Sequence, residues 1–295
     1  MLDKQVAETF RDKGCVVTGA SSGIGFAVSE ALLASGAEVF MADINEKGLA
    51  SATEKLAAYG GRVRNATVDV SKEDQVRGLI EDAVAIHGRL DFVFNNAGVG
   101  WGGAFEDATM ETWRRLLDIN LWSVIYGVHY AVPIMKRQGA GHIINTSSIG
   151  GLEPLPFESL YCTAKYAIMG LSQTLRFELA DAGVRVTAVC PGPVATAIFG
   201  IEEAQALKEI PGAVTPSEAA LAILTGVARN DAIIVFPEST EVIWRKYRSA
   251  PGLMEAYFLD FARERSRKGV LWSPDAAFDD AHGIAPPSEQ AAAQA

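Results

Sequence analysis

The sequence contains few cysteines, and no stretch of it concentrates positive charge. Its 295 residues include three cysteines, Cys15, Cys162 and Cys190, which show no CxxC spacing. Such a sparse, odd-numbered set predicts buried thiols in a reducing, cytoplasmic environment. The formal net charge is −10, and the Lys and Arg residues are scattered rather than clustered. Both features argue against nucleic acid or an anionic membrane surface as a partner.

Long apolar segments and metal-binding spacings are also missing. The first ten residues mix both charges, so we expect no secretory signal. The most apolar helical stretch, Leu121 to Met135, carries His129 and Pro133 and is too short to span a bilayer. The four histidines are scattered, with neither HExxH nor HxH spacing, so we expect no metal site.

Short apolar runs alternate with helical patterns along most of the chain. This alternation predicts a doubly wound α/β architecture with a mainly parallel sheet. The seven expected strands span residues 15–18, 38–42, 62–68, 91–94, 141–148, 185–190 and 232–236. After the fourth strand we expect a helix over 109–137 that is interrupted near Asp118 to Asn120 and again at Pro133.

The strand and helix pattern indicates one domain over residues 1–270. That domain includes an extension from about residue 238, where an aromatic-rich pattern up to residue 267 predicts one or two amphipathic helices. Residues 271–295 turn to Ala, Pro, Asp, Gln and Ser, which predicts a disordered tail.

A glycine-rich turn follows the first strand and opens the first long helix. Gly19, Gly23 and Gly25 give the spacing GxxxGxG. Glycines let the backbone approach a phosphate closely, and a helix N-terminus favours negative charge. Taken alone, such a turn is weak evidence for nucleotide binding, because most dinucleotide folds use GxGxxG instead.

An acidic residue, Asp43, ends the second strand, 18 residues after Gly25. An acid near this position accepts hydrogen bonds from adenosine ribose hydroxyls and repels a 2′-phosphate. The neighbouring Ser22 and Ile44 are not basic. The pattern therefore favours NAD over NADP as the cofactor. The alternative is a solvated aspartate that caps the next helix.

Tyr161 and Lys165 lie one turn apart in a helical pattern over 158–179. Residues i and i+4 share a helix face, so a phenol lies beside an ammonium group. By itself this YxxxK spacing is more typical of a solvated surface pair. Ser148 ends the preceding apolar run, and ligands bind at the carboxyl ends of parallel strands. Asn120 is polar within an apolar stretch, where such a residue commonly satisfies local backbone groups.

Taken together and in this order, the motifs resemble those of the short-chain dehydrogenase/reductase family in its single-domain form, over about residues 10–237. They are Thr18-Gly19-xxx-Gly23-x-Gly25, Asp69, Asn95-Asn96-Ala97-Gly98, Asn120, Ser148, Tyr161-xxx-Lys165 and Pro191-Gly192-xxx-Thr196. The resemblance implies a Rossmann fold, an NAD(P)-dependent alcohol dehydrogenase or ketoreductase, and a homodimer or homotetramer.

The resemblance also implies a role for each matching residue. The catalytic residues would be Asn120, Ser148, Tyr161 and Lys165. The cofactor-binding residues would be Gly19, Ser21, Ser22, Gly23, Ile24, Gly25, Asp43, Asp69, Val70, Asn96, Ala97, Gly98, Tyr161, Lys165, Pro191, Gly192, Val194 and Thr196.

In alcohol oxidation Tyr161 would accept the hydroxyl proton. Lowering the pKa of a phenol from about 10 to about 7 takes about 4 kcal/mol. A cation ~4 Å away at an effective dielectric of ~20 supplies a similar amount. We therefore expect Lys165 alone to be sufficient for this activation. Ser148 would orient the substrate oxygen, and Asn120 would hold a water that links Lys165 to solvent.

The residues expected to face the substrate are apolar: Val99, Trp101, Leu152, Phe157 and Phe199. They favour a bulky hydrophobic or aromatic secondary alcohol and its ketone, although each could instead pack in the core. The aromatic residues over 238–261 would close the pocket or bury a subunit interface. Two alternatives stay open, an NADPH-dependent carbonyl reductase and a non-catalytic dinucleotide-sensing protein on the same fold.

Overall fold

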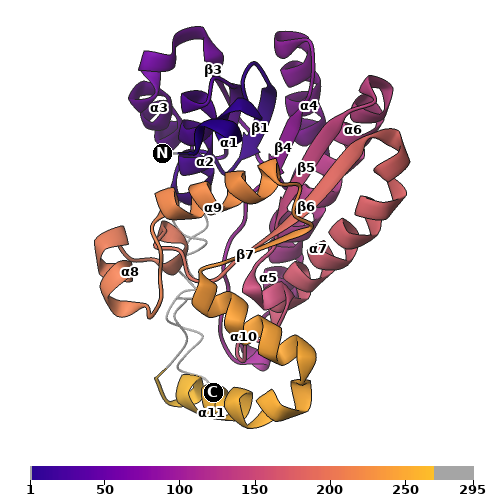
Figure 1. The fold of residues 1–295 in the computed structure, drawn as a ribbon. Helices are drawn as coiled ribbons and strands as arrows, with labels where there is room; N and C mark the ends of the chain where they lie inside the picture. Colours follow the sequence, from indigo (N-terminus) through magenta and orange to yellow (C-terminus); the bar gives the residue numbers. More distant parts are fainter. Residues whose placement is uncertain (1, 269–295) are drawn as a thin grey trace.

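The computed structural model describes residues 2–268, in which strands and helices alternate (Figure 1). The strands are β1 (Gly14–Thr18), β2 (Glu38–Asp43), β3 (Val63–Thr67), β4 (Phe92–Asn95), β5 (Gly141–Thr146), β6 (Val184–Pro191) and β7 (Ile233–Phe236). The α-helices are α1 (Lys4–Glu8), α2 (Gly23–Ala34), α3 (Glu46–Lys55), α4 (Glu73–His87), α5 (Met110–Leu117), α6 (Ser123–Gln138), α7 (Ser159–Glu178), α8 (Glu203–Glu209), α9 (Pro216–Ala228), α10 (Glu238–Ser249) and α11 (Glu255–Lys268).

The strands form one seven-stranded sheet in the order β3-β2-β1-β4-β5-β6-β7. Every neighbouring pair is parallel, so the predicted doubly wound α/β fold is confirmed. Each strand lies within two residues of its expected bounds. The strand order reverses between β1 and β4, and the crevice outside the carboxyl ends at such a reversal is where ligands bind in open α/β sheets.

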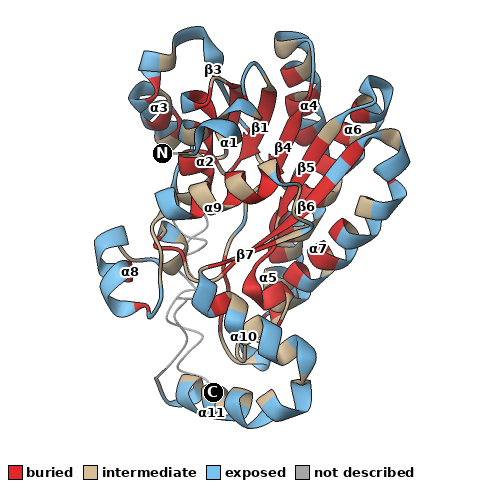
Figure 2. Ribbon diagram, in the orientation of Figure 1, coloured by how far each residue is buried: buried red, intermediate tan, exposed pale blue. Residues whose placement is uncertain are grey.

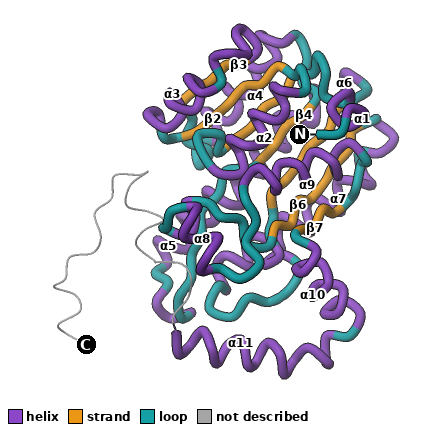
Figure 3. The backbone as a smooth tube through the Cα atoms, turned by 60° about the vertical axis from the view of Figure 1, so that its left-hand side comes forward, coloured by secondary structure: helices purple, strands orange, loops and turns teal. Residues whose placement is uncertain are grey.

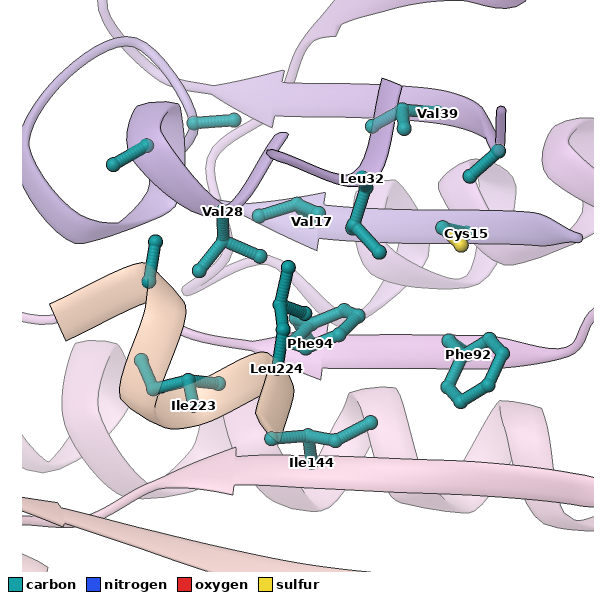
Figure 4. Packing of buried hydrophobic residues seen from close by; sticks show 14 of the residues in the cluster. Cys15, Val17, Val28, Leu32, Val39, Phe92, Phe94, Ile144, Ile223 and Leu224 are labelled. Carbon is teal, nitrogen blue, oxygen red and sulfur yellow. The ribbon is translucent and has the colours of Figure 1, made fainter. Parts of the chain in front are cut away.

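Helices cover both faces of the sheet, which explains why its central strands are apolar throughout. On one face, Leu32 of α2 and Leu224 of α9 pack over Val17 of β1 (Figure 4). On the other face, α4, α6 and α7 bury a second apolar cluster that includes Val128 and Ile168. Figure 2 shows the resulting pattern, with buried strands between helices that are buried only on their inner sides. A strand buried on both faces needs a continuous apolar run rather than an alternating one.

The burial of the three cysteines depends on where each lies in the sheet and the helices. Cys15 on β1 and Cys190 on β6 are buried, as expected for strand residues between two helix layers. Cys162, near the start of α7, is only half-buried, so the expectation of buried thiols is correct for two of the three cysteines. All three are free thiols.

The helical region over 109–137 is interrupted once. A π-helical turn over Asp118–Trp122 joins α5 to α6, so the interruption expected near Asn120 is confirmed. The second expected interruption is wrong, because α6 continues through Pro133. A proline removes one backbone hydrogen bond, and the buried face of α6 holds the helix together on both sides of it.

The C-terminal extension forms two helices joined by a short 3₁₀ segment, Pro251–Met254. Figures 1 and 3 both show α10 and α11 at the end of the molecule beyond β7. Arg265 of α11 holds this end to the main body, because its Nη1 donates to the Pro156 carbonyl at 2.9 Å and pairs with the Glu158 carboxylate. Residues 271–295, where a disordered tail is expected, lie outside the described residues.

Candidate active site

A cavity of about 1630 Å³ lies where the carboxyl ends of β1, β2, β4, β5 and β6 meet. A single small ligand typically occupies a pocket of about 300–1,000 Å³, so this cavity has room for a dinucleotide and a substrate together. All the residues expected to bind the cofactor line it: Gly19, Ser21, Ser22, Gly23, Ile24, Gly25, Asp43, Asp69, Val70, Asn96, Ala97, Gly98, Tyr161, Lys165, Pro191, Gly192, Val194 and Thr196.

The glycine turn has the geometry of a phosphate cradle. Gly19 adopts φ +67°, and a Cβ added there would lie 2.9 Å from the Ala97 Cα, so only glycine fits between the two chain segments. Helix α2 begins at Gly23, and its N-cap residue, Ser22, makes no side-chain hydrogen bond to the first turn. An uncapped helix N-terminus beside a close-packed glycine turn suits a diphosphate.

Asp43 lies at the rim of the cavity with its carboxylate held in place. One oxygen, Oδ2, accepts from the Ser21 N–H at 3.0 Å, and Oδ1 accepts from the Asn45 N–H at 2.9 Å. The first bond ties the end of β2 to the glycine turn. The carboxylate therefore lies beside the turn, where the adenosine end of a dinucleotide would place its ribose hydroxyls.

Thr18, the last residue of β1, links the two strands on which the cavity is centred. Its Oγ1 accepts from the backbone N–H groups of Asn96 and Ala97, both at 3.0 Å. The Asn96 side chain returns the contact by donating to the Thr18 carbonyl at 3.0 Å. Asn95, by contrast, is buried in the sheet, where it donates to Asn145 at 2.9 Å. The sequence places Thr18 in a motif but does not reveal this bracing role.

Tyr161, Lys165 and Ser148 meet on the β5–α7 side of the cavity. The ammonium of Lys165 lies 5.4 Å from the centre of the Tyr161 ring and donates to the Thr146 carbonyl at 3.0 Å. Ser148 was expected to end β5, but the strand stops at Thr146, and Ser148 caps the 3₁₀ turn Ile149–Gly151 instead. From there its side chain hydrogen-bonds the Tyr161 phenol.

Burial dominates the acid–base properties of this group. Desolvation raises the pKa of Tyr161 above its ordinary value, and the hydrogen bond from Ser148 lowers it only in part. Desolvation also lowers the pKa of Lys165 to about 8. The expectation that Lys165 alone brings the phenol near neutrality is therefore not met, because removing both groups from water opposes the charged form of each.

Asn120 lies in the π-helical turn and is fully buried. Its Oδ1 accepts from the Val99 N–H and its Nδ2 donates to the Val99 carbonyl, both at 2.8 Å. The amide thus acts as a backbone partner for the segment after β4, which matches the structural alternative raised by the sequence. It positions the segment at Gly98, where an added Cβ would meet Asn120 Oδ1 at 3.1 Å.

Of the five residues expected to face the substrate, two line the cavity and three do not. Val99 and Phe199 line the cavity. Trp101 is buried against Leu116 and Leu160, Leu152 packs beside Met169 and Cys190, and Phe157 lies outside the lining with a positive φ of 66°. Trp101 and Leu152 therefore pack in apolar clusters outside the lining.

Residues far apart in the sequence complete the substrate side of the cavity. Tyr257, Phe258 and Phe261 of α11 line it, as expected of aromatic residues that close the pocket. Charged residues on or next to α7 and α11 also line it, and none of them was singled out from the sequence: Glu153, Glu158, Glu264 and Arg265. Only Arg265 carries a local signal, since it lies one helical turn after Phe261 and stacks over that ring at 4.4 Å.

The part of the chain that the structure describes contains neither a metal-binding group of side chains nor a membrane-spanning helix. Across residues 2–268, His, Cys, Asp and Glu side chains form no group of three that could hold a metal ion. Within the same residues, no helix combines the length and hydropathy needed to cross a bilayer.

Comparisons with known proteins agree with this geometry. The model of the short chain dehydrogenase family matches residues 13–206. The chain is 34% identical over 209 residues to a cyclohexanol dehydrogenase of Acinetobacter sp., across 70% of this chain and 83% of that protein. It is 40% identical over 186 residues to 3beta-hydroxysteroid dehydrogenase 2 of Eggerthella lenta, across 62% and 71% of the two chains.

A solved structure gives the same result in three dimensions. The crystal structure of a short-chain dehydrogenase/reductase from Burkholderia phymatum in complex with NAD matches with a TM-score of 0.77 and 29% identity, over 83% of this chain and 96% of that one. The chain therefore belongs to the short-chain dehydrogenase/reductase family and is an NAD(P)-dependent oxidoreductase that acts on CH–OH groups.

Proposed function

We propose that the chain is an NAD-dependent dehydrogenase that interconverts a bulky hydrophobic secondary alcohol and its ketone, with Tyr161 as the acid–base group. The observation that carries this proposal is the hydrogen bond between Ser148 and Tyr161 inside the cavity that the glycine turn also lines. Bound NAD would supply the hydride acceptor. The residues of the chain would handle the proton and orient the alcohol.

Each residue of the group would contribute through its position. Tyr161 and Ser148 both line the cavity, so the carbinol oxygen can lie between the two hydroxyls while Tyr161 takes its proton. Lys165 lies behind the ring and, with its pKa at about 8, is largely protonated at neutral pH. Its charge opposes the desolvation of the phenolate, and the positive ring of oxidised nicotinamide would add to that effect. Asn120 would act by positioning Val99 and Gly98 rather than by contact with substrate.

The lining of the cavity supports an apolar substrate body. Val99, Leu155, Phe199, Ile243 and Phe258 surround the space on the substrate side. Apolar and aromatic walls with a few polar groups are typical of sites for small hydrophobic ligands. Cyclohexanol dehydrogenase and a hydroxysteroid dehydrogenase, both relatives of this chain by sequence, carry names that describe cyclic secondary alcohols.

Asp43 supports NAD as the preferred cofactor. Its carboxylate is fixed beside the glycine turn by Ser21 and Asn45, and Ile44 offers no positive charge for a 2′-phosphate. Titration with NADH and NADPH, followed by nicotinamide fluorescence, tests this preference. Tighter binding of NADPH would favour the alternative of a carbonyl reductase.

The acid–base role is tested by Tyr161→Phe, which removes only the phenol oxygen. We expect turnover of a panel of secondary alcohols with NAD to fall at least a hundredfold, because proton transfer contributes about 10²- to 10⁴-fold to such reactions. Affinity for NADH should stay nearly unchanged. Activity above a few per cent of the parent enzyme would contradict the assignment. A chain that binds NADH but oxidises no alcohol would favour the dinucleotide-sensing alternative.

We also propose that the chain forms a homodimer or homotetramer through α6 and α7. On α7, Phe177 is 79% exposed and Tyr166 is 42% exposed. The two residues lie eleven positions apart, which is close to three helical turns and places them on one face. Trp122, the last residue of the π-helical turn before α6, is 46% exposed. Large apolar side chains gathered on adjacent helices are typical of an interaction surface.

A further inference from the structure

One carboxyl group in the cavity has no assigned partner. Glu153 lies between the turn Ile149–Gly151 and α7, lines the cavity, and is only 5% exposed. Its Oε2 is buried and accepts no hydrogen bond from the part of the chain that the structure describes. Burial raises its pKa to about 7. The folded chain therefore holds a carboxyl group in a dry place and does not compensate its charge.

The arginine of α11 that lines the cavity is already engaged. Arg265 donates to the Pro156 carbonyl and forms a buried ion pair with Glu158. The lining near α7 and α11 thus includes the carboxyl groups of Glu153, Glu158 and Glu264 and one guanidinium, that of Arg265. The pKa of Tyr257 on α11 is raised mainly by burial and, in second place, by the negative charge of Glu153. Glu153 and Tyr257 both line the cavity.

An uncompensated buried carboxyl is costly, and a donor from outside the chain can offset that cost. Leaving a buried acceptor without a partner destabilises the fold, and more so when the group is charged. Apolar side chains, among them Leu155, Ile243 and Phe258, also line the cavity, so a substrate whose apolar body packs against them can place a polar group at Glu153. With a pKa of about 7, Glu153 is ionised in about half of the molecules at neutral pH. The ionised form only accepts hydrogen bonds, and a bound donor favours that form, so the matching substrate group is a donor.

We propose that Glu153 is a specificity-determining residue, which accepts a hydrogen bond from a second hydroxyl or an ammonium group on the otherwise apolar substrate. This inference rests on the proposed alcohol dehydrogenase function and narrows its substrate class to diols and amino alcohols. A site built to receive a donor also discriminates against analogues that lack it, since the buried acceptor is then unpaired.

The test compares matched pairs of alcohols that differ only by a second hydroxyl or an amino group, placed at increasing separation from the carbinol. We expect the parent enzyme to prefer the better diol or amino alcohol at least tenfold in kcat/KM over its monofunctional partner. Glu153→Leu should reduce that ratio to within about twofold. Glu153→Gln should keep part of the diol preference and lose the amino alcohol preference, since the amide accepts a hydrogen bond without carrying charge.

Two controls separate this inference from its alternatives. Glu255→Gln changes an exposed carboxylate on α11 outside the cavity and should leave the ratio intact. The affinity of a Tyr161→Phe variant for the same pairs of alcohols, measured by calorimetry, gives the preference without turnover. A ratio that Glu153→Leu does not change, by either measurement, overturns the inference. Failure of the parent enzyme to oxidise any alcohol would overturn the proposed function instead, and the calorimetric ratio would still decide the role of Glu153.

Discussion

At the residue scale, the burial of Lys165 opposes the stability of the fold. Its side chain is 4% exposed, and desolvation lowers its pKa from 10.5 to about 8. At ~1.4 kcal/mol per unit, this corresponds to a cost of about 3 kcal/mol for holding the charge in the folded chain. The hydrogen bond to the Thr146 carbonyl offsets about 1 kcal/mol of it. Burial at this position would not stabilise the fold through a lysine with a purely structural role. A lysine that acts on Tyr161, by contrast, has to lie beside the buried ring.

We predict that Lys165→Met stabilises the cofactor-free chain by about 1–2 kcal/mol at pH 7, while alcohol oxidation is lost. Methionine has a similar volume and carries no charge, so the desolvation cost disappears. Urea denaturation of the two proteins measures the difference. Between pH 8 and 10.5 the unfolded lysine binds a proton that the folded one has lost, so the stability contribution of Lys165 rises with pH. The advantage of the variant should therefore shrink across that window, and a constant gap would contradict a charge-based cost.

At the element scale, a buried ion pair links α11 to the start of α7. The side chains of Arg265 and Glu158 are 11% and 1% exposed, and the residues lie on elements 107 positions apart. Removing one partner of a buried pair typically costs about 3–5 kcal/mol, because the other charge stays in the low-dielectric interior. A single helix at the end of the chain can instead detach, which exposes the Glu158 carboxylate to water.

We predict that Arg265→Ala releases α11 and opens the substrate side of the cavity. Amide hydrogen exchange over residues 255–268 should lose protection, and KM for alcohols should rise about tenfold, while the affinity for NADH changes little. Arg263→Ala is a matched control, because Arg263 pairs with Asp260 on the exposed face of the same helix, where both side chains are more than half exposed. Equal effects of the two variants would show that the buried pair is not the anchor.

At the scale of the whole molecule, the exposed aromatic face of α7 predicts self-association. Phe177 is the more exposed of the two large apolar side chains on that face. Phe177→Glu would place a charge in the centre of a two-helix contact, where a desolvated carboxylate has no partner. We expect the molar mass measured by light scattering to fall from that of an oligomer to that of a single chain.

Leu253→Glu provides the comparison for this experiment. Leu253 is 84% exposed but lies in the 3₁₀ segment between α10 and α11, away from α6 and α7. Its variant should keep the parent mass. A parent protein that is already a single chain, or a Phe177→Glu variant of unchanged mass, would contradict an interface on α7.

The sequence by itself determined the features that depend on local spacing. The strand and helix order, the glycine turn, Asp43 at the end of β2 and the Tyr161–Lys165 pair all follow from periodicities within one or two elements. Their places in the sheet then follow from the rule that parallel strands end at a common edge. The strands accordingly lie within two residues of their expected bounds.

Only the tertiary structure decided which neighbouring side chains share the cavity. Trp101 turned out to pack under α5 and α7, and Asn120 to hold the Val99 backbone, because each depends on where a distant loop lies. Glu153, Glu158 and Arg265 come together only when α11 folds back over the start of α7. Burial then set the pKa values of Tyr161 and Lys165, since desolvation is a property of everything packed around a group and no spacing in the sequence records it.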